Sequence, residues 1–251
     1  MIALNMSTML RLLVVAFQLL LLVKANVEKT ILVAPKSIIL PQDAAIDNLL
    51  LESLHPDRLS VRTYLNASFP TQEKPHGEDT WALLEGLSPG QRYELRICWL
   101  ATQPTTFWID TFTLAETFET VDLITSLTAY SYARHARLSG SDIDALQADR
   151  FKPVIETNRT SLLFLRIQAA ADYFSLNKTL MENVPPVHVD LIFDPYLFNV
   201  FPLSLVPTAG YIIVIAVFSF FLSGWVYQQM MAYVNRNQRD APPTVEEKKV
   251  Q

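Results

Sequence analysis

The chain contains a single cysteine, Cys98, among its 251 residues. One cysteine cannot form an intrachain disulfide, so a domain on the secretory side of a membrane would depend on its apolar core for stability. We expect Cys98 to be a small buried residue of that core. A mixed disulfide with a partner protein is the alternative.

Glycine and histidine are also scarce, at 6 and 4 residues, and there is no Gly-rich phosphate loop, nucleophile elbow or cysteine–histidine pairing. Asp142 and Asp144 form the DxD pair that holds a metal in many sugar-nucleotide transferases. Here they begin a predicted helix, where the helix dipole favours acidic residues. His188 and Asp190 share one face of a predicted strand, but no third metal ligand accompanies them. The sequence therefore predicts no catalytic, cofactor-binding or metal-binding residue.

Positive charge is in deficit. Residues 26–203 carry 14 basic and 22 acidic side chains, a balance of −8. An acidic domain of this kind argues against nucleic acid as a partner, and against attachment to anionic lipids through bulk charge.

Charge is nearly absent from a first apolar stretch near the N-terminus. Arg11 precedes a run at 12–23 that is apolar apart from Gln18 and too short to cross a hydrocarbon core of ~30 Å. Val23 and Ala25 are small residues at the −3 and −1 positions of a cleavage site. We interpret residues 1–25 as a secretory signal peptide; an uncleaved anchor is the alternative.

A second charge-free stretch runs from 206 to 234. Residues 207–230 are long enough to span a bilayer, and Tyr211, Trp225 and Tyr227 lie where aromatic rings favour the headgroup level. Ser219 and Ser223 form a small-xxx-small pair next to Gly224, which predicts close packing against another membrane helix. We expect one transmembrane helix here.

A cleaved signal peptide followed by one span predicts a type I protein with the bulk of the chain in the lumen. Arg236 and Arg239 follow the span, as the positive-inside rule requires of a cytosolic side. The tail, 235–251, carries Lys248 and Lys249 at the fourth and third positions from its end. This pattern resembles the dilysine signal by which a coat complex retrieves membrane proteins to the endoplasmic reticulum (ER).

Three glycosylation sequons lie in the segment predicted to be luminal. Their asparagines are Asn66, Asn158 and Asn177. We expect each to be a glycan acceptor where it lies on the surface.

The sequence pattern of the luminal segment, 26–203, predicts mainly β structure. Leu87, Pro89, Gly90 and Tyr93 resemble the corner of a fibronectin type III sandwich, in which a tyrosine hydroxyl is tied back to the turn. Alternation of apolar and polar residues predicts strands at 93–99 and from 107 onward. Further strands are expected at 30–34, 37–40, 60–66, 80–84, 161–169 and 187–193. The predicted fold is a luminal β-sandwich followed by one C-terminal transmembrane helix.

A helical insertion is predicted within the sandwich at about 118–150. Val121, Ile124, Leu127 and Tyr130 recur at helical spacing, and a turn then precedes a second, N-capped helix. Just before the membrane span, six apolar residues crowd a short segment. We interpret them either as a final strand with its connector or as a collar that contacts the bilayer or a partner: Phe193, Tyr196, Leu197, Phe198, Phe201 and Leu203.

The layout of the whole chain, together with the segment "ANVEKTILVAP" at 25–35, resembles the fungal co-activator subunit of glycosylphosphatidylinositol (GPI) mannosyltransferase II. The resemblance implies a non-catalytic partner of a multipass ER enzyme. That enzyme adds the second mannose to the GPI precursor from dolichol-phosphate-mannose. The family offers no catalytic residue to transfer to this sequence.

Two other functions are compatible with the same layout. One alternative is a subunit or adaptor of another ER complex, which performs insertion, translocation or oligosaccharyl transfer. Alternatively, its sandwich is a carbohydrate- or lipid-binding module, which would require Trp81, Trp99 or Trp108 to be exposed.

Overall fold

The computed structural model describes residues 11, 14–15, 26–39, 46–148 and 159–239. The predicted signal peptide therefore lies almost entirely outside the described residues, as do Asn158, Lys248 and Lys249. By its internal contacts the chain divides into two units, Met1–Pro202 and Leu203–Gln251.

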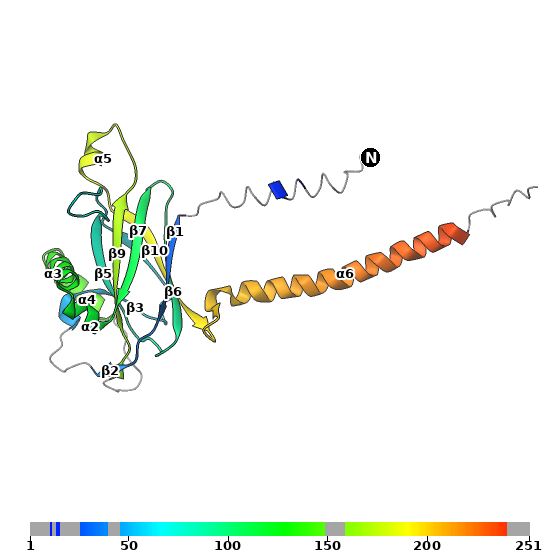
Figure 1. The fold of residues 1–251 in the computed structure, drawn as a ribbon, viewed down its shortest axis with the longest axis horizontal. Helices are drawn as coiled ribbons and strands as arrows, with labels where there is room; N and C mark the ends of the chain where they lie inside the picture. The colour runs from blue at the N-terminus through cyan, green and yellow to red at the C-terminus, as the bar shows by residue number, and fades with distance from the viewer. Residues whose placement is uncertain (1–10, 12–13, 16–25, 40–45, 149–158, 240–251) are drawn as a thin grey trace, which may run out of the picture. The chain divides into compact units, whose positions relative to one another are not determined.

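The first unit is built on two β-sheets, which are seen in Figure 1. One sheet consists of β1 (Val27–Val33), β6 (Arg92–Trp99), β10 (Val187–Leu197), β11 (Phe201–Pro202) and β4 (Ser60–Leu65). The other consists of β3 (Glu52–Leu54), β5 (Glu78–Leu84), β9 (Leu163–Ala171) and β7 (Thr105–Phe112). A short separate pair joins β2 (Ile38–Ile39) to β8 (Arg159–Thr160). Each segment that was predicted to be a strand contains one, which confirms the mainly β fold.

The main core lies between the two sheets. In β10, Val187, Val189, Leu191 and Phe193 are buried while the residues between them are more exposed, as expected of a strand with one face on a core. By contrast, β9 is buried along nearly its whole length. A strand reads as continuously apolar when both faces of its sheet are covered, and helices cover the second face of this sheet.

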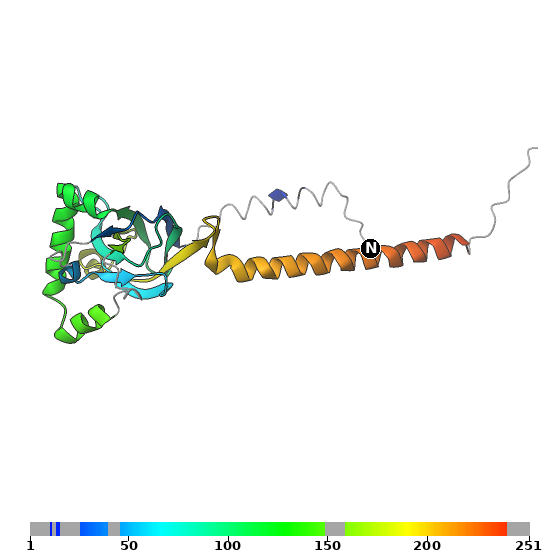
Figure 2. The same cartoon turned by 90° about the horizontal axis from the view of Figure 1, so that it is seen from below.

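The covering layer consists of α2 (Leu114–Glu119), α3 (Val121–His135) and α4 (Gly140–Ala148). These helices lie on the outer side of the β5–β9 sheet in both views (Figures 1 and 2). A second apolar cluster joins α3 to the sheet: Ile46, Leu51, Trp81, Leu83, Leu123, Leu127, Leu162 and Phe164. Leu114 of α2 packs against the edge of this cluster.

The predicted buried face of α3 was partly wrong. Leu127 is buried as expected, but Val121 is 74% exposed, and the buried stripe runs through Leu123, Leu127 and Ser131. Both stripes have helical spacing, so the choice between them depends on which one meets the sheet.

The predicted tyrosine corner is present between β5 and β6. The Tyr93 hydroxyl accepts a hydrogen bond from the backbone nitrogen of Ser88 at 3.0 Å and donates to Gln91 Oε1 at 3.1 Å. The turn itself closes when Gln91 N donates to the Ser88 carbonyl, with Gly90 at φ +78°. That left-handed value is the one a type II turn requires of its third residue.

The apolar collar predicted before the span is only partly exposed. Phe193 and Tyr196 belong to β10 and are buried, at 0% and 8% exposure. Phe198 is the most exposed of the six, at 88%, because it occupies the tip of the β10–β11 hairpin. The interpretation as a strand is thus correct for one half of the segment, and an exposed apolar surface remains in the other half.

The short elements that were not predicted from the sequence include three in the first unit. β3 pairs with β5 in parallel, η1 is a 3-10 helix at Ile46–Leu49, and α5 (Lys178–Glu182) lies in the loop before β10. All three are too short for periodicity to be informative.

The second unit is a short 3-10 helix, η2 (Leu203–Leu205), followed by one long helix, α6 (Val206–Arg239). Leu203–Tyr233 is the one stretch of the described chain long and apolar enough to cross a membrane. This outcome agrees with the single C-terminal transmembrane helix expected from the sequence. The α6 helix extends beyond the predicted residues 207–230 at both ends.

Candidate partner-binding surfaces

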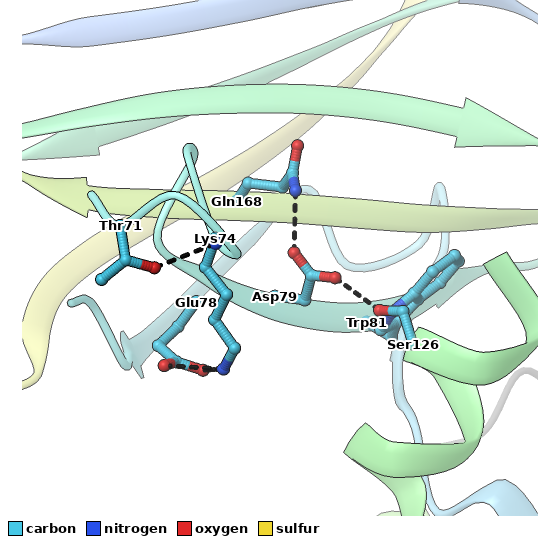
Figure 3. Close-up of polar contacts among 7 residues, drawn as sticks. All are labelled: Thr71, Lys74, Glu78, Asp79, Trp81, Ser126 and Gln168. Carbon is cyan, nitrogen blue, oxygen red and sulfur yellow. Dashed lines mark hydrogen bonds and ion pairs between the residues drawn. The ribbon is translucent and has the colours of Figure 1, made fainter. Parts of the chain in front are cut away.

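A polar network joins helix α3 to the sheet that it covers, and Figure 3 shows its centre. The Asp79 carboxylate on β5 accepts hydrogen bonds from the Ser126 hydroxyl of α3 and from the side-chain amide of Gln168 on β9, the latter at 2.8 Å. Ser126 in turn accepts from the indole nitrogen of the fully buried Trp81 at 2.9 Å. Every polar atom in this chain of contacts therefore has a partner, which orients α3 on the sheet.

The network continues to the loop that precedes β5. Because the Gln168 amide donates to Asp79, its carbonyl oxygen accepts from His76 Nδ1, 3.0 Å away. The His76 ring also stacks on Trp108, with ring centroids 4.2 Å apart. In the same loop, Lys74 binds Glu78 at 3.0 Å. These contacts hold the loop against β9.

Gly77 allows this loop to approach β9 closely. Its φ is +77°, and a Cβ atom there would lie 2.0 Å from the Ala169 carbonyl oxygen. Only glycine fits such a position without movement of the backbone. The sequence contained a signal for this site, a glycine beside a predicted strand, but not the contact that makes it necessary.

A hollow of about 410 Å³ opens between this loop and α3. Lys74 and Arg137 contribute positive charge to its lining, while Glu73, Glu78 and Asp79 contribute negative charge. Asn66 lies at its rim and is exposed. The hollow has the mixed polarity that suits a polar ligand, although Asp79 is already satisfied by its protein partners.

An apolar groove of about 730 Å³ lies on another part of the domain, between β2 and α2. Ile38, Ile39, Leu114 and Phe118 line it. Ile39 is 63% exposed, so the groove presents apolar surface to its surroundings.

Two of the three sequon asparagines are described, and both are exposed. Asn66 follows β4, and Asn177 precedes α5, where its side-chain oxygen accepts a hydrogen bond from the Thr179 backbone at 3.0 Å. Asn158 lies outside the described residues. The two described asparagines lie in different loops, one after β4 and one before α5.

The predicted helix-packing residues lie on α6. Ala216, Ser219 and Ser223 follow one another at spacings of three and four and therefore share one face of the helix. Phe218, Phe221 and Trp225, each two residues further along, lie roughly opposite, because each residue turns the helix by about 100°. Gly224 lies between the two faces. The helix thus has a small face and an aromatic face.

The residue pairs that might have suggested metal chemistry have structural partners. Asp190 forms a two-point ion pair with Arg62, at 2.7 and 2.9 Å. The Asp142 carboxylate accepts hydrogen bonds from the backbone and hydroxyl of Ser139, which caps α4. These contacts lower the pKa of both carboxyls. Among the described residues, no group of three or more potential ligands comes together.

Cys98 is not the buried core residue that was expected, and the tryptophans do not form an exposed binding surface. Cys98 on β6 is partly exposed, and burial raises the pKa of its thiol, which reduces the reactive thiolate. Trp81 is fully buried, while Trp99 and Trp108 are half-buried against Phe107 and His76. The carbohydrate-module hypothesis required exposed tryptophans, and these residues pack against the protein instead.

About half of the chain is similar to a known protein family. The sequence model of the GPI-mannosyltransferase II co-activator family matches residues 16–136, a region that includes β1 to β7 and helices α2 and α3. Over these residues the chain is similar to this co-activator family. No curated protein and no solved structure matches it.

The similarity is consistent with GPI-anchor biosynthesis at the ER and with a non-catalytic, accessory role. The matched region contains the tyrosine corner, most of the helical layer, and all of the Asp79 network except Gln168. A co-activator acts through contact with its enzyme, so the surfaces of the sandwich and of α6 are the sites at which its function must be sought.

Proposed function

We propose that the chain is the non-catalytic partner of a multipass ER mannosyltransferase and supports addition of the second mannose to the GPI precursor. The observation that carries this proposal is the match to the co-activator family. In this proposal the catalytic subunit binds dolichol-phosphate-mannose and performs the transfer. The chain described here stabilises or positions that subunit and does not touch the reacting groups.

The proposed orientation is type I, with the sandwich in the lumen and residues beyond α6 in the cytosol. Exposure of Asn66 and Asn177 supports a luminal domain, since both sequons are accessible to a glycan. Protease added to sealed microsomes is expected to spare the sandwich and to remove only the C-terminal tail. Digestion of the sandwich would contradict the orientation.

Helix α6 is the proposed contact with the catalytic subunit inside the bilayer. Its small face, formed by Ala216, Ser219 and Ser223, permits close approach of another helix, while aromatic side chains on the other side suit lipid. Among the residues that the structure describes, none covers the apolar length of this helix. A partner helix on the small face would bury it.

The central experiment is depletion of the protein followed by analysis of GPI precursors. Accumulation of the species with one mannose is expected, because the second mannose is then not added. A normal precursor profile would eliminate the proposed step. Purification of the tagged chain identifies its partner, and recovery of an insertion, translocation or oligosaccharyl-transfer complex without a mannosyltransferase would favour the adaptor hypothesis.

Replacement of small residues on α6 tests the membrane contact. The double substitution Ser219→Leu and Ser223→Leu is expected to reduce co-purification of the catalytic subunit and to cause the one-mannose precursor to accumulate. Phe218→Leu with Phe221→Leu is the matched control on the opposite face, and it should leave both measurements unchanged. Equal loss in both variants would argue against a face-specific contact.

Retrieval to the ER is proposed to depend on Lys248 and Lys249 through a coat complex. Replacing both lysines by serine should let a reporter that carries α6 and the tail reach the cell surface. Continued residence in the ER would show that another signal, such as the partner subunit, retains the protein.

A further inference from the structure

The hairpin between β10 and β11 has an unusual tip. Val200 N donates to the Leu197 carbonyl at 3.2 Å, and both residues inside this turn, Phe198 and Asn199, have left-handed backbones with φ +53° and +59°. Turns of this kind favour Asn and Gly, whereas a bulky residue at positive φ is rare and strained. The hairpin thus keeps a phenylalanine where the backbone disfavours one.

The side chain of Asn199 fixes the tip to the body of the sandwich. Its Oδ1 accepts a hydrogen bond from Arg92 N at 2.8 Å, and its Nδ2 donates to the Gly90 carbonyl at 3.0 Å. Both partners belong to the corner that Tyr93 stabilises. The hairpin is therefore a rigid extension of the sandwich, because these hydrogen bonds fix the conformation of its tip.

This rigid turn presents apolar side chains outward. Phe198 is 88% exposed and Val200 is 77% exposed, and Leu197 beside them is 41% exposed. No charged residue occurs between Asp194 and Arg236. Burial of such side chains is favourable, so an apolar or interfacial environment that covers the tip offsets the backbone strain.

The position of the tip in the chain points to the bilayer as that environment. The apolar stretch that begins at Leu203 is 31 residues long, or about 46 Å as a helix. This length matches the ~40–45 Å of a bilayer with its headgroups, so Leu203 lies at headgroup level. Phe198 is five residues earlier and at most ~18 Å away along the chain. An exposed aromatic ring at that depth is favoured by the interface.

We propose that Phe198 and Val200 insert into the headgroup layer of the leaflet at which α6 enters the membrane. The hairpin is then a second attachment of the chain to lipid, alongside the membrane span. Its specificity is for a lipid surface and not for charge, since the tip carries none. This inference rests on α6 being a membrane span and is independent of the identity of the mannosyltransferase partner.

Fluorescent labelling of the full-length chain tests the insertion. With Cys98→Ser as background, Val200→Cys is labelled with an environment-sensitive dye, and the protein is reconstituted alone into phosphatidylcholine vesicles. The label at position 200 is expected to emit at shorter wavelength and to be quenched several-fold more by spin-labelled lipid than a label at Leu176→Cys. Leu176 is the matched control, because it is 93% exposed in the loop that carries α5.

Two further outcomes decide the proposal. Adding Phe198→Ser to the Val200→Cys chain should reduce the quenching, while its thermal unfolding midpoint shows whether the sandwich remains folded. Water-like emission at position 200 without lipid quenching would overturn the proposal. Protection that appears only when the catalytic subunit is added would also overturn it, in favour of a protein contact. Since the vesicles contain no mannosyltransferase, failure here leaves the proposed co-activator function untouched.

Discussion

Several residues have left-handed backbone conformations, and each occurs at a tight turn or at a close approach between segments. Gly77 brings a loop against β9, and Gly90 forms the turn before β6. Phe198 and Asn199 hold the hairpin tip. The two glycines differ in one respect, because a Cβ at Gly77 would collide with backbone whereas nothing lies within 4 Å of a Cβ at Gly90.

That difference leads to a prediction for a matched pair of variants. Gly90→Ala should lower the free energy of unfolding by about 1–2 kcal/mol, the usual cost of a left-handed alanine. Gly77→Ala should cost clearly more, because the Ala169 carbonyl must also move. Urea unfolding of both variants measures the difference. Equal losses would mean that the loop shifts without cost.

The ion pair between Asp190 and Arg62 predicts a dependence on pH. The hydrogen bond from Arg62 keeps the pKa of the Asp190 carboxyl below its usual value of 3.8. A lowered folded-state pKa contributes stability that is present above the unfolded pKa and is lost as the pH falls through the folded pKa. Asp190→Asn should therefore be less stable than the wild type at neutral pH, and the two should converge as the pH falls through the lowered pKa of Asp190. Thermal unfolding across this range tests the prediction, and a constant difference would contradict it.

At the scale of elements, helix α3 is the part of the sandwich most dependent on tertiary contacts. Its inward face places Leu123 and Leu127 against Trp81 and Phe164, and Ser126 joins the Asp79 network. Periodicity predicted a helix here, yet two stripes with helical spacing were available. The stripe with Leu123 meets the sheet, and the Ser126 hydroxyl on the same side of the helix bonds Asp79.

Truncation of Leu127 should separate this docking from the helix itself. Leu127→Ala removes a side chain that is 1% exposed and should destabilise the domain by about 2–5 kcal/mol. Tyr132→Ala is the control on the same helix, because Tyr132 is 80% exposed and its loss should be nearly neutral. Denaturant unfolding compares them. A comparable cost for both variants would indicate that the exposed face of α3 also has a structural role.

At the scale of the whole molecule, the chain consists of a sandwich with its own cores and a separate apolar helix. Both buried clusters draw all their residues from between Leu32 and Phe193, and none comes from α6. With one cysteine in the sequence, no intrachain disulfide contributes to either unit. The stability of the sandwich therefore comes from its packing.

This independence predicts how a truncated chain behaves. Residues 26–202 should fold without α6, and their unfolding temperature should be the same with and without a reducing agent, because no disulfide is available to reduce. Calorimetry in both conditions provides the measurement. A fall in unfolding temperature under reducing conditions would reveal an intermolecular bond through Cys98.

The amino-acid sequence by itself determined the strands, the helical insertion, the tyrosine corner and the membrane helix. Each of these depends on local periodicity, on turn residues such as Pro89 and Gly90, or on an uninterrupted apolar length, and such signals lie close together in the chain. Only the tertiary structure decided which face of α3 is buried, why Gly77 must be glycine, and that Asn199 holds Phe198 at an exposed tip. Those features arise from contacts between residues far apart in sequence, up to 109 positions for Asn199 and Gly90, and no local pattern records them.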